Sequence, residues 1–137
     1  MFSRMYNNIN LLEKSLDATW LKQETISQNI ANNDTPGYDR KRVEFDDEFR
    51  AALMNSSNFQ GKKTRGKHID IGAASNPLNV TPRVVSDRHY TMRMDGNNVD
   101  IDQEMAEQAQ NTLMYSALVT KLNKEFGRLR TVIKEGR

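Results

Sequence analysis

Residues 30–38 read IANNDTPGY, and this stretch decides where a long N-terminal helix ends. Residues 1–26 before it contain neither Pro nor Gly. Pro36 moves the residue that precedes it out of the helical region, and Gly37 permits a tight turn with a positive φ. Asn32 and its polar neighbours can bond the carbonyl groups that are freed at a helix end. The stretch therefore predicts a helix stop followed by a specific turn.

The segment upstream of this turn keeps a helical apolar rhythm. We predict a helix over residues 5–32, with a seam that recurs at alternating steps of three and four residues. The seam consists of Phe2, Met5, Ile9, Leu12, Leu16, Thr19, Gln23, Ile26 and Ile30, two of which are polar. Trp20 is the only tryptophan, and we expect it to pack against a partner.

A second long helix is predicted over residues 100–134, with Asp100 as its N-cap and Gln103 completing a capping box. Its seam also alternates by fours and threes, through Ile101, Met105, Gln108, Thr112, Tyr115, Val119, Leu122, Phe126, Leu129 and Ile133. A lone helix gains little stability from so narrow a seam. We therefore expect the two helices to form a coiled coil, with further apolar surface left for neighbours.

The segment between the helices has a different character. Residues 33–50 are predicted to form the turn and an extended arm, and residues 51–98 a flexible middle segment. Residues 55–80 show no clear period, which favours a mobile loop or a small irregular subdomain. Short strands are predicted within residues 83–94, before a turn at residues 95–96. The expected fold is one mainly α domain with a coiled-coil inner part, an irregular or short-β middle and partial disorder in the monomer.

The composition narrows the class of protein. Hydrophobic residues make up 36% of the 137 residues and the mean hydropathy is −0.79, which is lean for a compact globular core. The net charge of +2 does not indicate a polyanionic partner. The chain has no Cys, so it forms no disulfide and no thiolate metal site. The N-terminus lacks the apolar core of a cleaved signal peptide, so any export is expected to proceed without one.

Two stretches approach known ligand-binding motifs. Residues 61–68, GKKTRGKH, almost match a P-loop, but His68 replaces the hydroxyl that binds Mg²⁺, and neither a buried strand nor a long helix flanks them. Residues 95–100 partly match a calcium-binding loop, but Val99 replaces an oxygen ligand. His68 and His89 are the only histidines and lack a metal-binding spacing. We therefore expect no catalysis, cofactor, metal, small-molecule substrate or nucleic acid.

Residues 30–38 resemble the ANxxTPGY signature of the bacterial flagellar rod and hook axial proteins, where it also ends the N-terminal helix. The residues that carry this turn motif are Ala31, Asn32, Thr35, Pro36, Gly37 and Tyr38. Residues 94–105, MDGNNVDIDQEM, and 115–119, YSALV, resemble the proximal rod members of that family. Asn33 stands where Ala is frequent in the family, a departure that leaves the turn intact.

The resemblance implies a structural subunit. In the family, the terminal helices form a coiled-coil inner tube, and subunits stack helically into a hollow rod that transmits torque and passes export substrates. The arm after the first helix lies against neighbouring subunits. The implied partners are further copies of the chain, other rod proteins, the protein that joins the rod to the MS ring, and the flagellar type III export apparatus. The implied location is the basal-body rod, which crosses the periplasm.

Phe45, Phe49 and Leu53 resemble the Phe-x-x-x-hydrophobe pattern by which early substrates are recognised at the export gate. An apolar helix pair four residues apart gives the same spacing.

Two other classes of protein remain as alternatives. A helical coiled-coil adaptor would form a small oligomer of fixed stoichiometry instead of a helical stack. A nucleic-acid-binding protein would use the basic residues 61–68, and salt-dependent binding would be its mark.

Overall fold

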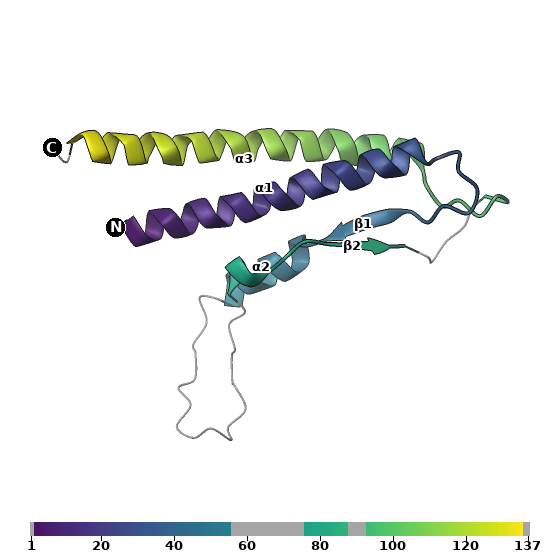
Figure 1. Cartoon of the computed structure of the whole chain (residues 1–137), viewed down its shortest axis with the longest axis horizontal. Coiled ribbons are helices and arrows are strands. Elements are labelled where there is room, and N and C mark those ends of the chain that lie inside the picture. The colour runs from purple at the N-terminus through teal and green to yellow at the C-terminus, as the bar shows by residue number, and fades with distance from the viewer. Residues whose placement is uncertain (1, 56–75, 88–92, 136–137) are drawn as a thin grey trace, which may run out of the picture.

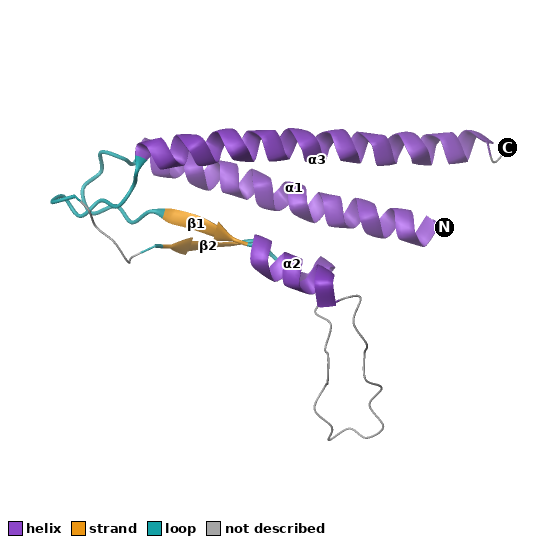
Figure 2. Cartoon of the chain, turned by 180° about the vertical axis from the view of Figure 1, so that it is seen from behind, coloured by secondary structure: helices purple, strands orange, loops and turns teal. Residues whose placement is uncertain are grey.

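The computed structural model describes residues 2–55, 76–87 and 93–135. Two long helices, α1 over Phe2–Ala31 and α3 over Ile101–Glu135, run antiparallel and side by side (Figure 1 and Figure 2). The first residues of α1 and the last residues of α3 lie at the same end of this pair, where α3 reaches further than α1 (Figure 1). Among the described residues, no helix is long and apolar enough to cross a membrane.

Four short elements lie between the two helices in the chain. They are β1 over Lys41–Glu44, α2 over Asp46–Asn55, the 3-10 helix η1 over Pro77–Asn79, and β2 over Arg83–Ser86. β1 and β2 form a two-stranded antiparallel sheet in which Val43 is opposite Val84. Residues 39–55, which include β1 and α2, are called the arm from here on. Both views show the arm folded back along α1 (Figure 2).

The prediction of a mainly α chain, with long terminal helices and a short strand pair in the middle, is confirmed. The extended conformation predicted as far as residue 50 is wrong after Phe45, because α2 begins at Asp46. The first turn of α2 holds three consecutive acidic residues, which the positive end of a helix dipole favours. The P-loop-like stretch and both histidines lie outside the described residues.

The helix stop after α1 follows the predicted chemistry. The backbone N–H of Asn32 donates to the carbonyl of Gln28 at 3.1 Å, and that of Thr35 donates to the carbonyl of Asn32 at 3.0 Å. Gly37 then adopts a φ of 70°. Glycine reaches this left-handed conformation without the steric cost that a Cβ adds. The chain therefore leaves α1 through a closed, hydrogen-bonded turn.

The start of α3 is also capped by the predicted residue. The Asp100 carboxylate accepts from the backbone N–H groups of Asp102 and Gln103 at 3.0 and 3.3 Å. The reciprocal half of the predicted capping box, in which the Gln103 side-chain oxygen would accept from the N–H of Asp100, is not among the hydrogen bonds of the described residues. The Gln103 side-chain nitrogen donates to the carboxylate of Glu107, one turn along the helix, at 3.1 Å.

A small apolar core joins the arm to α1. Ala18, Phe45, Ala52 and Val80 are buried together, and Val43 and Phe49 pack against them. The rings of Phe45 and Phe49 stack with their centroids 4.7 Å apart. Because Ala18 belongs to α1, this core fixes the arm against the helix pair.

On the α1 side, the predicted seam residues Leu12 and Ile26 are buried, and Ile9, Leu16 and Ile30 are half-buried. On α3, four predicted seam residues are half-buried: Gln108, Val119, Leu122 and Leu129.

The other residues of the seam predicted on α3 are not buried between the two helices. Four of its members, Met105, Tyr115, Phe126 and Ile133, are exposed. The stripe of α3 that is buried instead includes the polar residues Glu104 and Asn111. These two side chains form hydrogen bonds with groups on α1 that an apolar side chain could not form. As a result, α3 directs this polar stripe toward α1 and leaves its most apolar stripe exposed.

Replacing Ala52 with Leu is expected to lower the free energy of unfolding by about 1–3 kcal/mol, because added methylene groups strain a packed core. Thermal unfolding followed by circular dichroism measures this change. Ala51→Leu is the matched control, since Ala51 is the preceding residue of the same helix and is exposed. Equal melting temperatures for the two variants would contradict the closed packing around Ala52.

Candidate functional site: a polar junction of α1, the arm and α3

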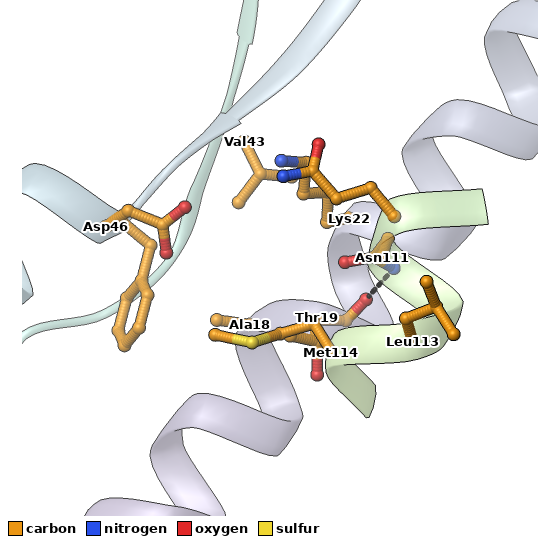
Figure 3. Close-up of a pocket in the computed structure, with 10 residues that line it drawn as sticks. Ala18, Thr19, Lys22, Val43, Asp46, Asn111, Leu113 and Met114 are labelled. Carbon is orange, nitrogen blue, oxygen red and sulfur yellow. Dashed lines mark hydrogen bonds between the residues drawn. The ribbon is translucent and has the colours of Figure 1, made fainter. Parts of the chain in front are cut away.

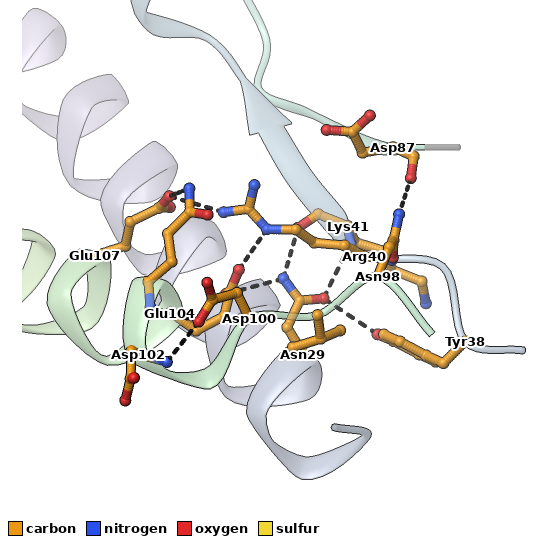
Figure 4. A network of polar contacts seen from close by, with 12 residues as sticks. Asn29, Tyr38, Arg40, Lys41, Asp87, Asn98, Asp100, Asp102, Glu104 and Glu107 are labelled. Carbon is orange, nitrogen blue, oxygen red and sulfur yellow. Dashed lines mark hydrogen bonds and ion pairs between the residues drawn. The ribbon is translucent and has the colours of Figure 1, made fainter. Parts of the chain in front are cut away.

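A network of polar side chains joins the end of α1, the start of the arm and the start of α3 (Figure 4). This network is called the junction. It consists of Asn29, Tyr38, Arg40, Asn97, Asn98, Glu104 and Glu107. Three of its members, Asn29, Asn97 and Glu104, are almost completely buried.

Asn29 connects all three segments through one side-chain amide (Figure 4). Its nitrogen donates to the carbonyl of Lys41 at 2.7 Å and to the carboxylate of Glu104 at 3.0 Å. Its oxygen accepts from the backbone N–H of Lys41 at 3.0 Å and from the hydroxyl of Tyr38 at 3.3 Å. The amide thus exchanges both hydrogen bonds with Lys41, as a residue on a neighbouring strand would. A helix side chain therefore positions the start of β1.

Glu104 is fully buried and ionically paired with Arg40. The Arg40 Nε donates to one carboxylate oxygen of Glu104, while Asn29 occupies the other. The second end of the guanidinium donates to Glu107 at 2.7 Å. A buried carboxylate costs several kcal/mol in desolvation unless charged and hydrogen-bonding partners offset it. Glu104 has both kinds of partner, so the arm is bound to α3 at a defined place.

Burial acts to lower the pKa of Arg40, but the hydrogen bonds and charges of Glu104 and then Glu107 outweigh it and raise that pKa above its ordinary value. The Tyr38 pKa is raised above its ordinary value, first by burial and then by the negative charge of Glu104. Arg40 therefore stays charged and the Tyr38 hydroxyl stays a donor at neutral pH.

The backbone of Arg40 is held as firmly as its side chain. Its N–H donates to the side-chain oxygen of Asn98 at 2.6 Å, and its carbonyl accepts from the N–H of Asp87 at 2.7 Å. The Asn98 amide nitrogen in turn donates to the carbonyl of Asp87. These three residues close a ring of hydrogen bonds that joins the arm to the end of β2 and to the approach to α3.

Asn97, which lies in the segment just before α3, binds the end of α1. Its side-chain nitrogen lies 2.9 Å from each of three carbonyl oxygens, those of Asn32, Asn33 and Thr35. Its side-chain oxygen accepts from the N–H of Val99 at 2.8 Å. Carbonyl groups at a helix C-terminus have no partner within the helix. The buried Asn97 amide supplies that partner, so we call this contact the Asn97 clamp.

The two glycine turns that flank the clamp bind each other directly. Gly37 and Gly96 have φ values of 70° and 77°. The N–H of Gly37 donates to the carbonyl of Asp95 at 2.9 Å. The turn that ends α1 and the turn that precedes α3 are therefore one hydrogen-bonded unit.

The residues of the predicted turn motif contribute to this unit mainly through their backbones. Asn32 and Thr35 offer carbonyls to the clamp, Gly37 offers its N–H, and Tyr38 offers its hydroxyl. Thr35 also donates from its hydroxyl to the Asn32 side chain at 3.2 Å. Ala31, the last residue of α1, and Pro36 are both exposed.

The residues that resemble an export-gate pattern lie in the arm. Phe45 is buried in the core and Phe49 is half-buried against it, while Leu53 is 39% exposed. Their spacing therefore serves the packing of α2 on α1. A role in export stays a prediction.

The sequence did not single out the residues on which the junction depends: Asn29, Arg40, Asn97 and Glu104. Their partners lie up to 75 residues away, so no local pattern reveals these contacts. Two signals were available: Asn97 and Glu104 lie within residues 94–105, which carry part of the family resemblance, and Asn29 is an amide within the apolar rhythm of a helix that is about to end.

An open groove of about 390 Å³ separates the arm from the helix pair (Figure 3). Ala18 and Thr19 of α1, Val43 and Phe45 of the arm, and Met114 of α3 are among its lining residues. Within the described parts of the chain, no group of three His, Cys, Asp or Glu residues could hold a metal ion.

Replacing Asn97 with Asp is expected to lower the free energy of unfolding by about 2–4 kcal/mol, because a carboxylate has no donor for three carbonyl oxygens. Chemical denaturation followed by circular dichroism measures the loss. Asn79→Asp makes the same change at an exposed position and serves as the control. A midpoint for Asn97→Asp that equals that of the control would show that the clamp contributes nothing.

Replacing Glu104 with Gln is expected to cost about 3 kcal/mol, because it leaves the Arg40 guanidinium partly buried beside a neutral group. Glu107→Gln alters the same cation at a more exposed position and is expected to cost less than about 1 kcal/mol. The same denaturation measurement compares the two. Similar losses for both variants would contradict the central place of the buried pair.

Known proteins can be aligned with this sequence along nearly its whole length. A family model described as flagella basal body rod protein matches residues 7–38, which include most of α1 and the turn that the Asn97 clamp holds. The flagellar basal body rod protein FlgB of Bacillus subtilis is 36% identical over 129 residues, covering 94% of this chain and 95% of that protein.

FlgB of Borreliella burgdorferi is 33% identical and covers 93% of this chain and 96% of its own length. FlgB of Salmonella typhimurium is 29% identical and covers 99% of both chains. The shared sequence thus includes both long helices and the junction between them. The chain belongs to the FlgB family of flagellar basal body rod proteins, and its function is that of a structural rod subunit.

Proposed function

We propose that many copies of this chain assemble helically into the proximal part of a hollow rod, which transmits torque from the flagellar motor to the hook and passes export substrates. Membership of the FlgB family supports the rod, and the antiparallel helix pair provides an elongated unit of the kind that can stack. The same membership favours a rod subunit over a helical coiled-coil adaptor.

The observation that carries the proposal is the junction. A torque-bearing subunit needs an arm that keeps a fixed direction relative to its helices, since a loosely attached arm would yield under load. Asn29, Arg40 and Asn97 fix that direction by binding three separate segments. The specific turn at residues 32–38 therefore serves to aim an interface element.

Exposed apolar side chains supply the surface for contacts between copies. Trp20 is 61% exposed on α1, beside Tyr115 of α3, which lines the same shallow pocket. The other exposed large apolar side chains of α3 are Ile101, Met105, Leu113, Met114, Phe126, Val132 and Ile133. Large exposed apolar patches mark interaction sites in soluble proteins. The seam residues that the helix pair leaves uncovered would thus be buried in the assembled rod.

The proposed partners are further copies, other rod proteins, the protein that joins the rod to the MS ring, and the flagellar type III export apparatus. The role is structural rather than enzymatic, and the location is the rod where it crosses the periplasm. Export would proceed without a cleaved signal peptide, with Phe45, Phe49 and Leu53 as the candidate gate-recognition residues. Because Phe45 is buried in the folded chain, such recognition would require the unfolded state.

A clean deletion of the gene tests the proposed function. Swimming is scored, and basal bodies are imaged by electron microscopy. We expect loss of motility, with membrane rings present but no rod or hook, and restoration by the gene supplied in trans. Motile cells with intact rods would contradict the proposal and favour the alternative of a helical coiled-coil adaptor.

Replacing Pro36 and Gly37 together with Ala is expected to abolish swimming while secretion of the protein continues. Ala at position 37 costs about 1–2 kcal/mol in the left-handed conformation, so the helix extends and the arm is misdirected. Swimming plates and immunoblots of secreted protein measure the two effects.

Gly127→Ala is the control for this change. Gly127 lies within α3 with open space around its Cα, and Ala there stabilises the helix by about 1 kcal/mol. Swimming of the control is expected to be normal. Normal rods in the Pro36 and Gly37 variant would refute the aiming role of the turn.

A further inference from the structure

Asn111 is buried in the contact between α1 and α3 but takes no part in the junction. Its side chain is reached by solvent to only 5%. The amide nitrogen donates to the carbonyl of Thr19 at 2.9 Å, a contact drawn in Figure 3, and to the side-chain oxygen of Gln23 at 2.9 Å. All three residues belong to the two long helices. The contact therefore joins α1 to α3 without using the arm.

The position of Gln23 in the seam of α1 gives this contact a consequence for register. One heptad before Gln23 the seam carries Leu16, and one heptad after it the seam carries Ile30. Sliding α3 along α1 by seven residues, about 10 Å, would place Asn111 opposite one of these apolar side chains. Apolar contacts that repeat every seven residues largely survive such a slip, whereas a buried amide loses its partner.

We propose that the Asn111–Gln23 contact is a second register lock, which holds α1 and α3 in their antiparallel alignment independently of the junction. Register determines how far the end of α3 extends beyond the start of α1 (Figure 1). In a rod subunit, as proposed above, the lock would preserve that overhang when the subunit is under load. The lock itself is a property of the single chain and does not depend on that function.

Glu125 shows that burial and heptad spacing alone do not make a lock. It lies fourteen residues after Asn111 and is also buried. Its hydrogen-bond and ion-pair partner is Arg128, at 2.9 Å on the same helix. A contact within α3 moves with α3 during a slip and therefore sets no register. Asn111 differs because its partners lie on α1.

The test measures distances between spin labels in the full chain by double electron–electron resonance. Cys replaces Glu24 of α1 and Lys124 of α3, which are both exposed, and the chain contains no other Cys. These two positions are offset along the helix pair, so a slip changes their separation by about 10 Å. Asn97→Asp removes the Asn97 clamp, and Glu104→Ala removes the contacts of α3 with Asn29 and Arg40. The chain that carries both substitutions is called the opened chain, and in it the second lock can be observed alone.

We expect the opened chain to keep the single distance of the native chain. Adding Asn111→Leu is expected to produce a second population shifted by about 10 Å. Adding Asn123→Leu, the same substitution at an exposed position of α3, is expected to leave the single distance unchanged.

A shifted population in the opened chain without further change would overturn the proposal, because Asn111 would then be insufficient to hold the register. An unshifted single distance in the opened chain with Asn111→Leu would overturn it equally. If the opened chain has a lowered helical circular dichroism signal, Asn97→Ala, which adds no charge, replaces Asn97→Asp in it. Swimming is not the readout, so failure of the lock and failure of the rod function are distinguishable.

Discussion

The buried amide of Asn29 is the contact on which the remaining structure depends. It forms hydrogen bonds with both the carbonyl and the N–H of Lys41 and with one carboxylate oxygen of Glu104. One side chain therefore holds α1, the arm and α3 at a common point. Each such bond adds only about 0.5–1.5 kcal/mol net, but a buried amide left without partners costs about 1–3 kcal/mol. The main effect of the network is therefore to disfavour other directions of the arm, because those directions would leave the buried amide without partners.

Stability and direction come from different parts of the molecule. The apolar core of Ala18, Phe45, Ala52 and Val80 attaches the arm to α1 through contacts that are not directional. Arg40 and its partners add the directional constraint. The core is small because much of the apolar surface, including Trp20, lies outside it. Under the proposed function, neighbouring subunits cover that surface in the rod.

The long helices, the stop after α1 and the cap at Asp100 could be predicted because helical periodicity, Pro-Gly turns and capping act over a few residues. The junction could not, since Asn29 and Glu104 lie 75 residues apart and neither is marked until α1 and α3 have paired. α2 was missed because it is short and its fully buried residue, Ala52, adds no strong apolar signal. The exposure of Met105, Tyr115, Phe126 and Ile133 was not predicted, because counting apolar residues cannot reveal that Asn111 has partners on α1.

The most direct test of the account is electron cryomicroscopy of purified basal bodies that contain this chain, at a resolution that separates side chains. The account holds that the junction is the fixed part of the subunit during assembly. It predicts that Asn29 still contacts the backbone of Lys41 and that Arg40 still pairs with Glu104 in every copy of the rod. An arm that leaves α1 in a different direction, with Arg40 separated from Glu104, would contradict it.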